Sequence, residues 1–230
     1  MASFNEIIAN VARVQARIGA ACERAGRAVD GVTLVAISKT HPVPAIEAAH
    51  LAGVRDFGEN RVQEALPKIE AVSGPHMHRI DARWHLVGHL QRNKVAAAIG
   101  RFDILHSVDS ERLAEAIGES AEAPVKALIE VNVAGEASKH GVAPGDVAAL
   151  AARMARTPNI ELLGLMTVAP RADDPEDIRP VFRTLRELRD GLGLTELSMG
   201  MTDDFEVAVE EGSTLVRVGR AIFGARGEQA

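Results

Sequence analysis

The chain is short of cysteine and of aromatic residues, and each shortage excludes a class of protein. Its 230 residues include one cysteine, one tryptophan, six phenylalanines and no tyrosine. The lone Cys22 cannot form a disulfide within the chain, so folding needs no oxidising compartment. A net charge of -6 and so few aromatic rings leave neither a basic stripe nor a stacking surface for nucleic acid.

Long apolar runs are missing as well. No segment has the ~20 consecutive apolar residues of a membrane span, and the N-terminus does not combine a basic region with an apolar run as secretion signals do. We therefore expect a cytoplasmic protein without nucleic-acid or membrane partners. The length and the 47% content of hydrophobic residues fit a single domain over residues 1–230.

The chain does contain a regular alternation of short apolar runs with helical patterns. Residues 3–28 predict an amphipathic first helix, opened by a capping box of Ser3 and Glu6. Strands are predicted at 32–38, 54–58, 84–88, 102–108, 126–133, 161–168, 196–200 and 214–219. Helices are predicted between them at 43–53, 61–72, 91–99, 110–121, 144–156, 176–191 and 203–211.

This alternation predicts an α/β fold, a single (β/α)8 TIM barrel with an extra N-terminal helix. An open doubly wound sheet is the alternative, because periodicity alone does not close a sheet. The first strand is not followed by the G-x-G-x-x-G turn of the dinucleotide-binding form of that alternative.

One lysine stands out by its position. Active sites of such barrels are built at the C-terminal ends of the strands. Of the five lysines, Lys39 alone directly follows a predicted strand, so its amine would enter the mouth of the barrel. The other four fall in helices, at a strand start or in a loop: Lys68, Lys94, Lys126 and Lys139.

Small and hydroxyl-bearing residues follow the seventh and eighth predicted strands, where barrels often bind phosphate. The segments are Ser198-Met199-Gly200-Met201-Thr202 and Arg217-Val218-Gly219-Arg220. Small residues let backbone N–H groups approach an anion, and the hydroxyls add donors. Together with the amine of Lys39, these segments describe a site for a phosphate-bearing aldehyde.

Seven segments in order from residue 35 to residue 226 resemble the pyridoxal phosphate homeostasis protein family. They are VAISKTHP, DFGENRVQE, WHLVGHLQRNK, HSVDS, VNVAGEASKHG, GLMTVAP and LSMGMTDDFEVAVEEGSTLVRVGRAIFGAR. The resemblance implies a monomeric barrel like the N-terminal domain of alanine racemase, holding pyridoxal 5'-phosphate (PLP) as a Schiff base. It also implies a role in vitamin B6 homeostasis, with effects on amino-acid and keto-acid balance, and no established catalytic activity.

The resemblance also assigns cofactor-binding roles to particular residues. Lys39 matches the Schiff-base lysine, and Arg217 matches an arginine that faces the pyridine nitrogen. Ser198, Gly219 and Arg220 match the phosphate-binding segments. Met199 and Thr202, in the same segment as Ser198, are also expected to bind the cofactor. Asn60 and His85 are expected to line the mouth.

We predict a PLP carrier rather than an enzyme, with no catalytic residues. Because an arginine cannot accept a proton, Arg217 would keep the pyridine nitrogen neutral and weaken the cofactor as an electron sink. The related racemase takes its second base, a tyrosine, from another domain, and we expect neither here. Another second base would have to come from the predicted strand-end histidines, His41, His85, His106 and His140, which more simply have structural roles.

The carrier would supply PLP to apo-enzymes through transient contacts. The alternatives are a PLP-dependent amino-acid racemase or related enzyme, and a non-catalytic module that senses the cofactor through a partner protein.

Other charged and histidine-rich segments have simpler interpretations. His76-Met77-His78 lacks a third ligand, so no metal site is predicted. Asp203 and Asp204 are expected to cap a helix. Solvated helix faces are predicted for Arg183, Arg186, Arg189, Glu210 and Glu211.

Overall fold

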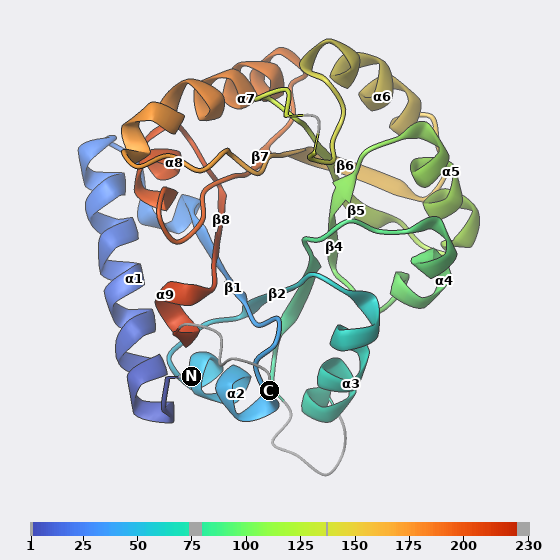
Figure 1. The fold of residues 1–230 in the computed structure, drawn as a ribbon. Helices are drawn as coiled ribbons and strands as arrows, with labels where there is room; N and C mark the ends of the chain where they lie inside the picture. Colours follow the sequence, from blue (N-terminus) through green and yellow to red (C-terminus); the bar gives the residue numbers. More distant parts are fainter. Residues whose placement is uncertain (1, 74–79, 137, 225–230) are drawn as a thin grey trace.

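The computed structural model describes residues 2–73, 80–136 and 138–224. Eight parallel strands close into a barrel in sequence order, with the last strand paired to the first (Figure 1). The strands are β1 (Thr33–Ile37), β2 (Asp56–Glu59), β3 (Arg83–Leu86), β4 (Ile104–Val108), β5 (Val125–Glu130), β6 (Ile160–Met166), β7 (Glu196–Ser198) and β8 (Leu215–Val218). The predicted barrel is confirmed, and the open sheet is excluded.

Helices surround the strands and bury their outer faces (Figure 1). They are α1 (Phe4–Arg24), α2 (Val43–Leu51), α3 (Val62–Ser73), α4 (Val95–Ala98), α5 (Glu111–Ser120), α6 (Val147–Met154), α7 (Arg179–Gly191), α8 (Phe205–Glu210) and α9 (Arg220–Phe223). Short 3-10 turns lie at η1 (Val29–Gly31), η2 (Arg92–Lys94), η3 (Pro144–Asp146) and η4 (Pro175–Ile178). The helix expected over 91–99 is thus a 3-10 turn followed by one helical turn. Among the described residues no helix is both long and apolar enough to cross a membrane.

The extra helix α1 begins as its sequence predicts. Ser3 and Glu6 form the reciprocal capping box, which satisfies two backbone N–H groups at the helix start. One face is buried against α2, α8 and α9, and it includes the fully buried Cys22. The helix therefore packs over the part of the barrel where β8 pairs with β1 and closes the sheet.

The barrel interior holds a small apolar cluster of Val35, Ile37, Leu128, Met166 and Leu215. These residues come from β1, β5, β6 and β8 and are separate from the larger core between the strands and the helices. Because side chains alternate along a strand, every second residue of each strand reaches this interior. Polar residues occupy several of the remaining inward positions, and they form the site described below.

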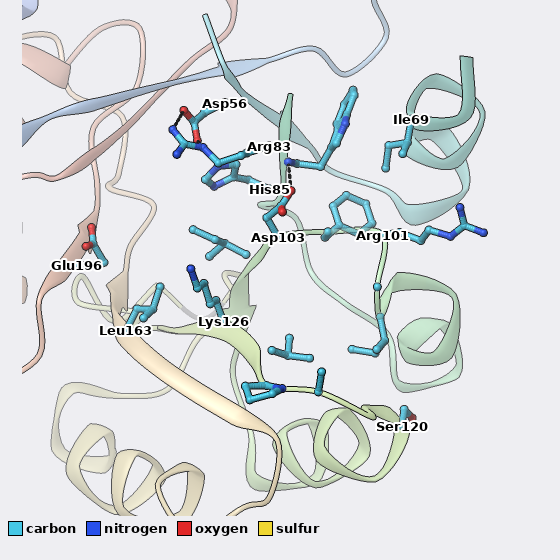
Figure 2. A pocket seen from close by; sticks show the side chains of 18 of the residues that line it. Asp56, Ile69, Arg83, His85, Arg101, Asp103, Ser120, Lys126, Leu163 and Glu196 are labelled. Carbon is cyan, nitrogen blue, oxygen red and sulfur yellow. Dashed lines mark hydrogen bonds and ion pairs between the residues drawn. The ribbon is translucent and has the colours of Figure 1, made fainter. Parts of the chain in front are cut away.

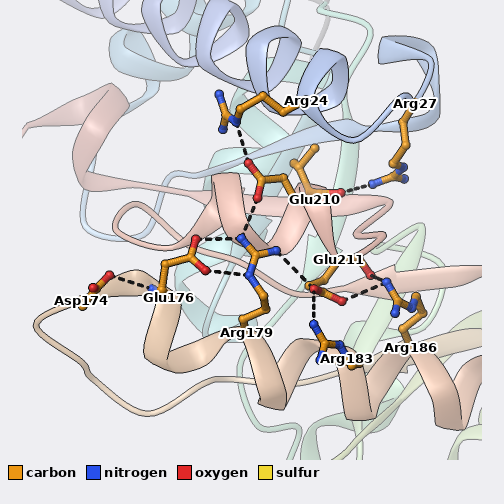
Figure 3. A network of polar contacts seen from close by, with 10 residues as sticks. Arg24, Arg27, Asp174, Glu176, Arg179, Arg183, Arg186, Glu210 and Glu211 are labelled. Atoms are coloured by element: carbon orange, nitrogen blue, oxygen red, sulfur yellow. Dashed lines mark hydrogen bonds and ion pairs between the residues drawn. The ribbon is translucent and has the colours of Figure 1, made fainter.

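Four of the five charged residues expected on solvated helix faces, all except Arg189, belong to a partly buried network instead (Figure 3). Glu211, with 6% of its side chain exposed, lies 3.2 Å from Arg179, 3.3 Å from Arg183 and 2.9 Å from Arg186 of α7. Glu210 pairs with Arg24 and Arg179 at 2.7 Å each. Arg189 pairs with Asp190. The network ties α7 and α8 to α1, because carboxylates and guanidiniums from distant segments meet there.

Candidate functional site

Lys39 lies at the C-terminal end of β1, at the mouth of the barrel. The backbone N–H of Ser38 bonds to Gly58 O at 3.0 Å, so pairing with β2 continues up to the residue before the lysine. Lys39 itself is half-buried. Thr40 then turns the chain with a φ of 66°, a left-handed conformation that is rare for a β-branched residue. Such strain persists only where the surroundings hold it, which is typical of functional sites.

A partly buried cluster of Lys68 and Glu64 from α3 with Glu59 from β2 holds this turn in place. Lys68 Nζ donates to Ser38 O at 2.9 Å, to Glu59 Oε1 at 2.8 Å and to Glu64 Oε1 at 2.9 Å. Glu64 accepts the backbone N–H of Thr40. Burial raises the pKa of Glu59, although hydrogen bonds from Lys68 and Ser38 act against that rise. The sequence predicts only that Lys68 lies in a helix. Its spacing of four residues from Glu64 is the local signal for the ion pair between them.

Arg217 of β8 lies inside the barrel with 4% of its surface exposed. Its Nη1 donates to Ser198 Oγ at 2.6 Å and its Nη2 to the Thr167 carbonyl at 2.7 Å. Burial lowers the pKa of Arg217 to about 10, against the opposing charges of Asp204 and Glu130. The side chain is therefore still a cation at neutral pH, and both of these hydrogen-bond partners are uncharged.

Ser198 and His85 lie deeper than the sequence suggested. Ser198 is fully buried, and its Oγ is shared between Arg217 and His106 Nδ1, the latter at 2.8 Å. His85 is fully buried in β3 rather than lining the mouth, with His106 Nε2 2.9 Å from its Nδ1 and Asp56 Oδ1 2.9 Å from its Nε2. Both residues are thus part of the barrel interior, beneath the expected cofactor site.

The expected phosphate segments follow β7 and β8. Gly200 has a φ of 90°, and a Cβ there would lie 2.5 Å from Ala208 Cβ, so a glycine is needed. Met199 is buried, whereas Thr202 and Gly219 are half-buried. Arg220 is exposed and pairs with Asp203 at 2.5 Å.

Asp204, the residue after Asp203, stabilises the same loop with a hydrogen bond. Asp204 occupies the N-cap position of α8, but its side chain accepts the Met201 N–H at 2.6 Å instead of one from the helix. The expectation that Asp203 and Asp204 cap this helix is therefore wrong: neither side chain caps α8 with a hydrogen bond.

Asn60 follows β2 and lies at the rim of the barrel. It lines a hollow of about 560 Å³ together with Gly88, His89 and His140. A Cβ at Gly88 would lie 2.3 Å from the Asn60 carbonyl oxygen, so the two loops are in close contact. Asn60 lines this hollow, and its role as a cofactor contact stays a prediction.

Three residues at this rim could hold a metal ion. The potential ligand atoms of His89, Asp109 and His140 all lie within 4.8 Å of one another. His89 Nδ1 lies 3.1 Å from Asp109 Oδ2, and the two imidazoles stack at 4.1 Å between centroids. The prediction that the chain holds no metal stays a prediction. His76-Met77-His78 lies outside the described residues.

A larger cavity, of about 1200 Å³, opens at the opposite end of the barrel, where the strands begin (Figure 2). Charged residues of both signs line it, including Arg83, Asp103, Lys126 and Glu196. Figure 2 shows Arg83 against Asp56, with His85 beside them. Of the predicted cofactor-binding residues, His85 alone lines this cavity.

A closed barrel of eight parallel strands with helices around it is a (β/α)8 barrel. The family model for the N-terminal domain of alanine racemase matches residues 8–227. The pyridoxal phosphate homeostasis protein of Aquifex aeolicus is 45% identical over 225 residues, which cover 94% of this chain and 96% of that protein. The chain belongs to the pyridoxal phosphate homeostasis protein family.

Solved structures agree with this assignment. A protein of unknown function from Bifidobacterium adolescentis is 41% identical, with a TM-score of 0.90 over 96% of this chain and 95% of that chain. PipY of Synechococcus elongatus, solved with PLP bound, is 38% identical, with a TM-score of 0.77 over 84% of this chain and 93% of that chain.

Proposed function

We propose that the protein binds PLP covalently through Lys39 at the mouth of its single barrel domain, residues 1–230, and serves PLP homeostasis. The observation that carries the proposal is that the half-buried Lys39 follows β1, while the buried cation Arg217 lies in β8, the strand that pairs with β1. The family supports it, because the relatives are named for PLP homeostasis and PipY was solved with PLP.

The residues present fit this cofactor. The amine of Lys39 can form an imine with an aldehyde. Arg217 can only donate hydrogen bonds, which suits an unprotonated pyridine nitrogen. Backbone N–H groups of the loops that follow Met199 and Gly219, with the Thr202 hydroxyl and the Arg220 guanidinium, suit a phosphate.

We further propose that the protein is a carrier and not an enzyme. PLP supplies an electron sink for carbanion chemistry, but a racemase also needs a second base at the mouth. His85 and His106 are fully buried with both ring nitrogens bonded, and His41 is buried against Phe223. This leaves His140 as the exposed member of the four candidate histidines. We propose a monomer in the cytoplasm that contacts apo-enzymes only transiently.

Borohydride reduction followed by mass spectrometry of peptides tests the attachment. The reduced adduct is expected on Lys39 and is expected to be absent from Lys39→Ala. Lys126→Ala is the matched control: this exposed lysine starts β5 at the other end of the barrel, so the adduct should persist. Circular dichroism checks that both variants fold. An adduct on Lys68, Lys94 or Lys139 would refute the assignment.

Incubation of the PLP-loaded protein with L-alanine in deuterated water tests the carrier proposal. Because Arg217 would leave the pyridine nitrogen unprotonated and the electron sink weak, the α-proton should exchange slowly if at all. Because the carrier proposal includes no second base, D-alanine should not accumulate. Each missing catalytic group costs a factor of roughly 100 to 10,000 in rate. Accumulation of D-alanine over many turnovers would establish the racemase alternative, with His140 as the candidate base.

A further inference from the structure

A continuous row of buried polar groups crosses the barrel interior beneath the proposed cofactor site. It runs from Arg217 through Ser198, His106 and His85 to Asp56, with successive distances of 2.6, 2.8, 2.9 and 2.9 Å. The five residues come from five strands, and each is at most 5% exposed. The proposed PLP contacts use only the Arg217 end of the row.

The donors and acceptors in this row can be assigned from one end. A guanidinium only donates, so Ser198 Oγ accepts from Arg217 and can give its single hydrogen to His106 Nδ1. His106 then carries its hydrogen on Nε2 and donates to His85 Nδ1. His85 in turn carries its hydrogen on Nε2 and donates to Asp56 Oδ1. Every bond is satisfied with both histidines neutral.

The opposite direction fails at both ends. It would require Ser198 Oγ to accept hydrogen bonds from both Arg217 and His106. The hydroxyl hydrogen of Ser198 would then have no acceptor among the residues of the row. The opposite direction would also require a charged His85 beside His106. Burial lowers the pKa of His106 well below its usual value, the cation Arg217 adds to that effect, and a charge on His85 would add to it further. The row therefore has one direction, from Arg217 to Asp56.

Asp56 can end the row because it stays ionised. Arg83 binds it with two hydrogen bonds, of 2.8 and 2.7 Å, at the cavity shown in Figure 2. Burial acts to raise the pKa of Asp56, but hydrogen bonds from His85 and Arg83 outweigh it and lower the pKa overall. A carboxylate accepts only, so the last hydrogen bond cannot reverse.

We propose that Asp56, His85, His106 and Ser198 form a one-directional hydrogen-bond relay that positions Arg217 for the pyridine ring of PLP. The inference rests on the proposed function and assigns Ser198 to the pyridine side of the cofactor rather than to its phosphate. Arg217 also donates to the Thr167 carbonyl, so two of its five N–H donors fix the guanidinium in place. Glu130 and Asp204 are the other charged groups acting on it.

The relay predicts the state of the histidines without any cofactor. Nitrogen-15 NMR of the full-length PLP-free protein should find His106 neutral, with its hydrogen on Nε2, from pH 5 to pH 8. Asp56→Asn should remove this preference, because an amide can donate as well as accept. A His106 that is charged, or that carries its hydrogen on Nδ1, would refute the relay. The wild-type measurement requires no variant to fold.

Ser198→Ala tests the link to the cofactor, and Ser107→Ala is the matched control. Both serines are fully buried, but Ser107 Oγ donates to the Gly88 carbonyl outside the relay. Ser198→Ala should weaken binding of PLP and of unphosphorylated pyridoxal equally, by about tenfold. It should also shift the nitrogen-15 signal of the bound pyridine nitrogen, whereas Ser107→Ala should change neither quantity.

The outcomes separate the relay from the proposed function. Loss of PLP affinity with unchanged pyridoxal affinity would place Ser198 at the phosphate and refute the relay. An unchanged pyridine signal in Ser198→Ala would do the same. Ser198→Thr keeps a hydroxyl and should restore affinity and signal. If wild-type protein forms no adduct on Lys39, the proposed function fails, while the NMR of the PLP-free protein still decides the hydrogen-bond direction.

Discussion

Glu211→Gln is expected to destabilise the protein even though Glu211 is not part of the proposed cofactor site. The carboxylate is 6% exposed and lies between three guanidiniums of α7, as Figure 3 shows. Arg179 and Arg183 donate hydrogen bonds to it, whereas Arg186 lies 2.9 Å from Oε2 without the alignment of a hydrogen bond. Glutamine keeps the shape but removes the charge, so like charges on α7 lose their common partner.

The expected loss in the free energy of unfolding follows from how exposed the three arginine partners of Glu211 are. A fully buried ion pair costs about 3–5 kcal/mol to break, and an exposed pair less than about 1 kcal/mol. The arginine side chains are 23%, 52% and 34% exposed, so we expect an intermediate loss of about 2 kcal/mol. For a chain of this length that corresponds to roughly 4–8 °C in melting temperature.

Urea unfolding followed by circular dichroism measures the loss. The control is Glu206→Gln, which breaks the pair with Arg17, whose side chains are 34% and 45% exposed. The control should change the free energy of unfolding by less than about 1 kcal/mol. Equal losses for the two variants would mean that the network around Glu211 stabilises no more than a surface pair, and the reasoning would be refuted.

Two further predictions concern pH and backbone packing. Burial acts to raise the pKa of Glu211, but its arginine partners lower the pKa overall. The difference in the free energy of unfolding between wild type and Glu211→Gln should therefore have its full size above the pKa of an unfolded glutamate, about 4.3. It should disappear as the pH falls through the lower pKa of the folded state. Urea titrations at pH 7 and pH 3 check this, and a constant difference would contradict it. Gly164→Ala should cost more than about 3 kcal/mol, or prevent folding, because its Cβ would lie 1.9 Å from the Glu196 carbonyl oxygen on the neighbouring strand. Gly145→Ala, with nothing within 4 Å of the new Cβ, should stay within about 0.5 kcal/mol in the same unfolding assay.

The barrel and the position of Lys39 could be predicted because both depend on local signals. Strands buried on both faces appear as short apolar runs, and helices appear between them with a different period. A polar residue directly after such a run is at a strand end. Ser3 and Glu6 could be paired for the same reason, since a capping box is complete within four residues.

The relay could not be predicted, because it depends on contacts between strands. His85 lies between the buried residues Trp84 and Leu86, so the sequence around it shows no alternation that tells inside from outside. His106 and Ser198 meet only because β4 and β7 lie across the barrel from each other, 92 residues apart in sequence. The sequence likewise predicts that Glu211 and the arginines around it are solvated, because the carboxylate and the arginines lie on different helices.

The cluster around Lys68 has a consequence for chemical selectivity. The ammonium of Lys68 donates to the carbonyl of Ser38, so a second amine lies against the backbone of the residue before Lys39. Its three hydrogens have three acceptors, and an amine held in that form has no lone pair to attack a carbonyl carbon. A reactive aldehyde entering the mouth would therefore find no lone pair on the amine of Lys68, which under the proposed function leaves Lys39 as the reactive amine of these two.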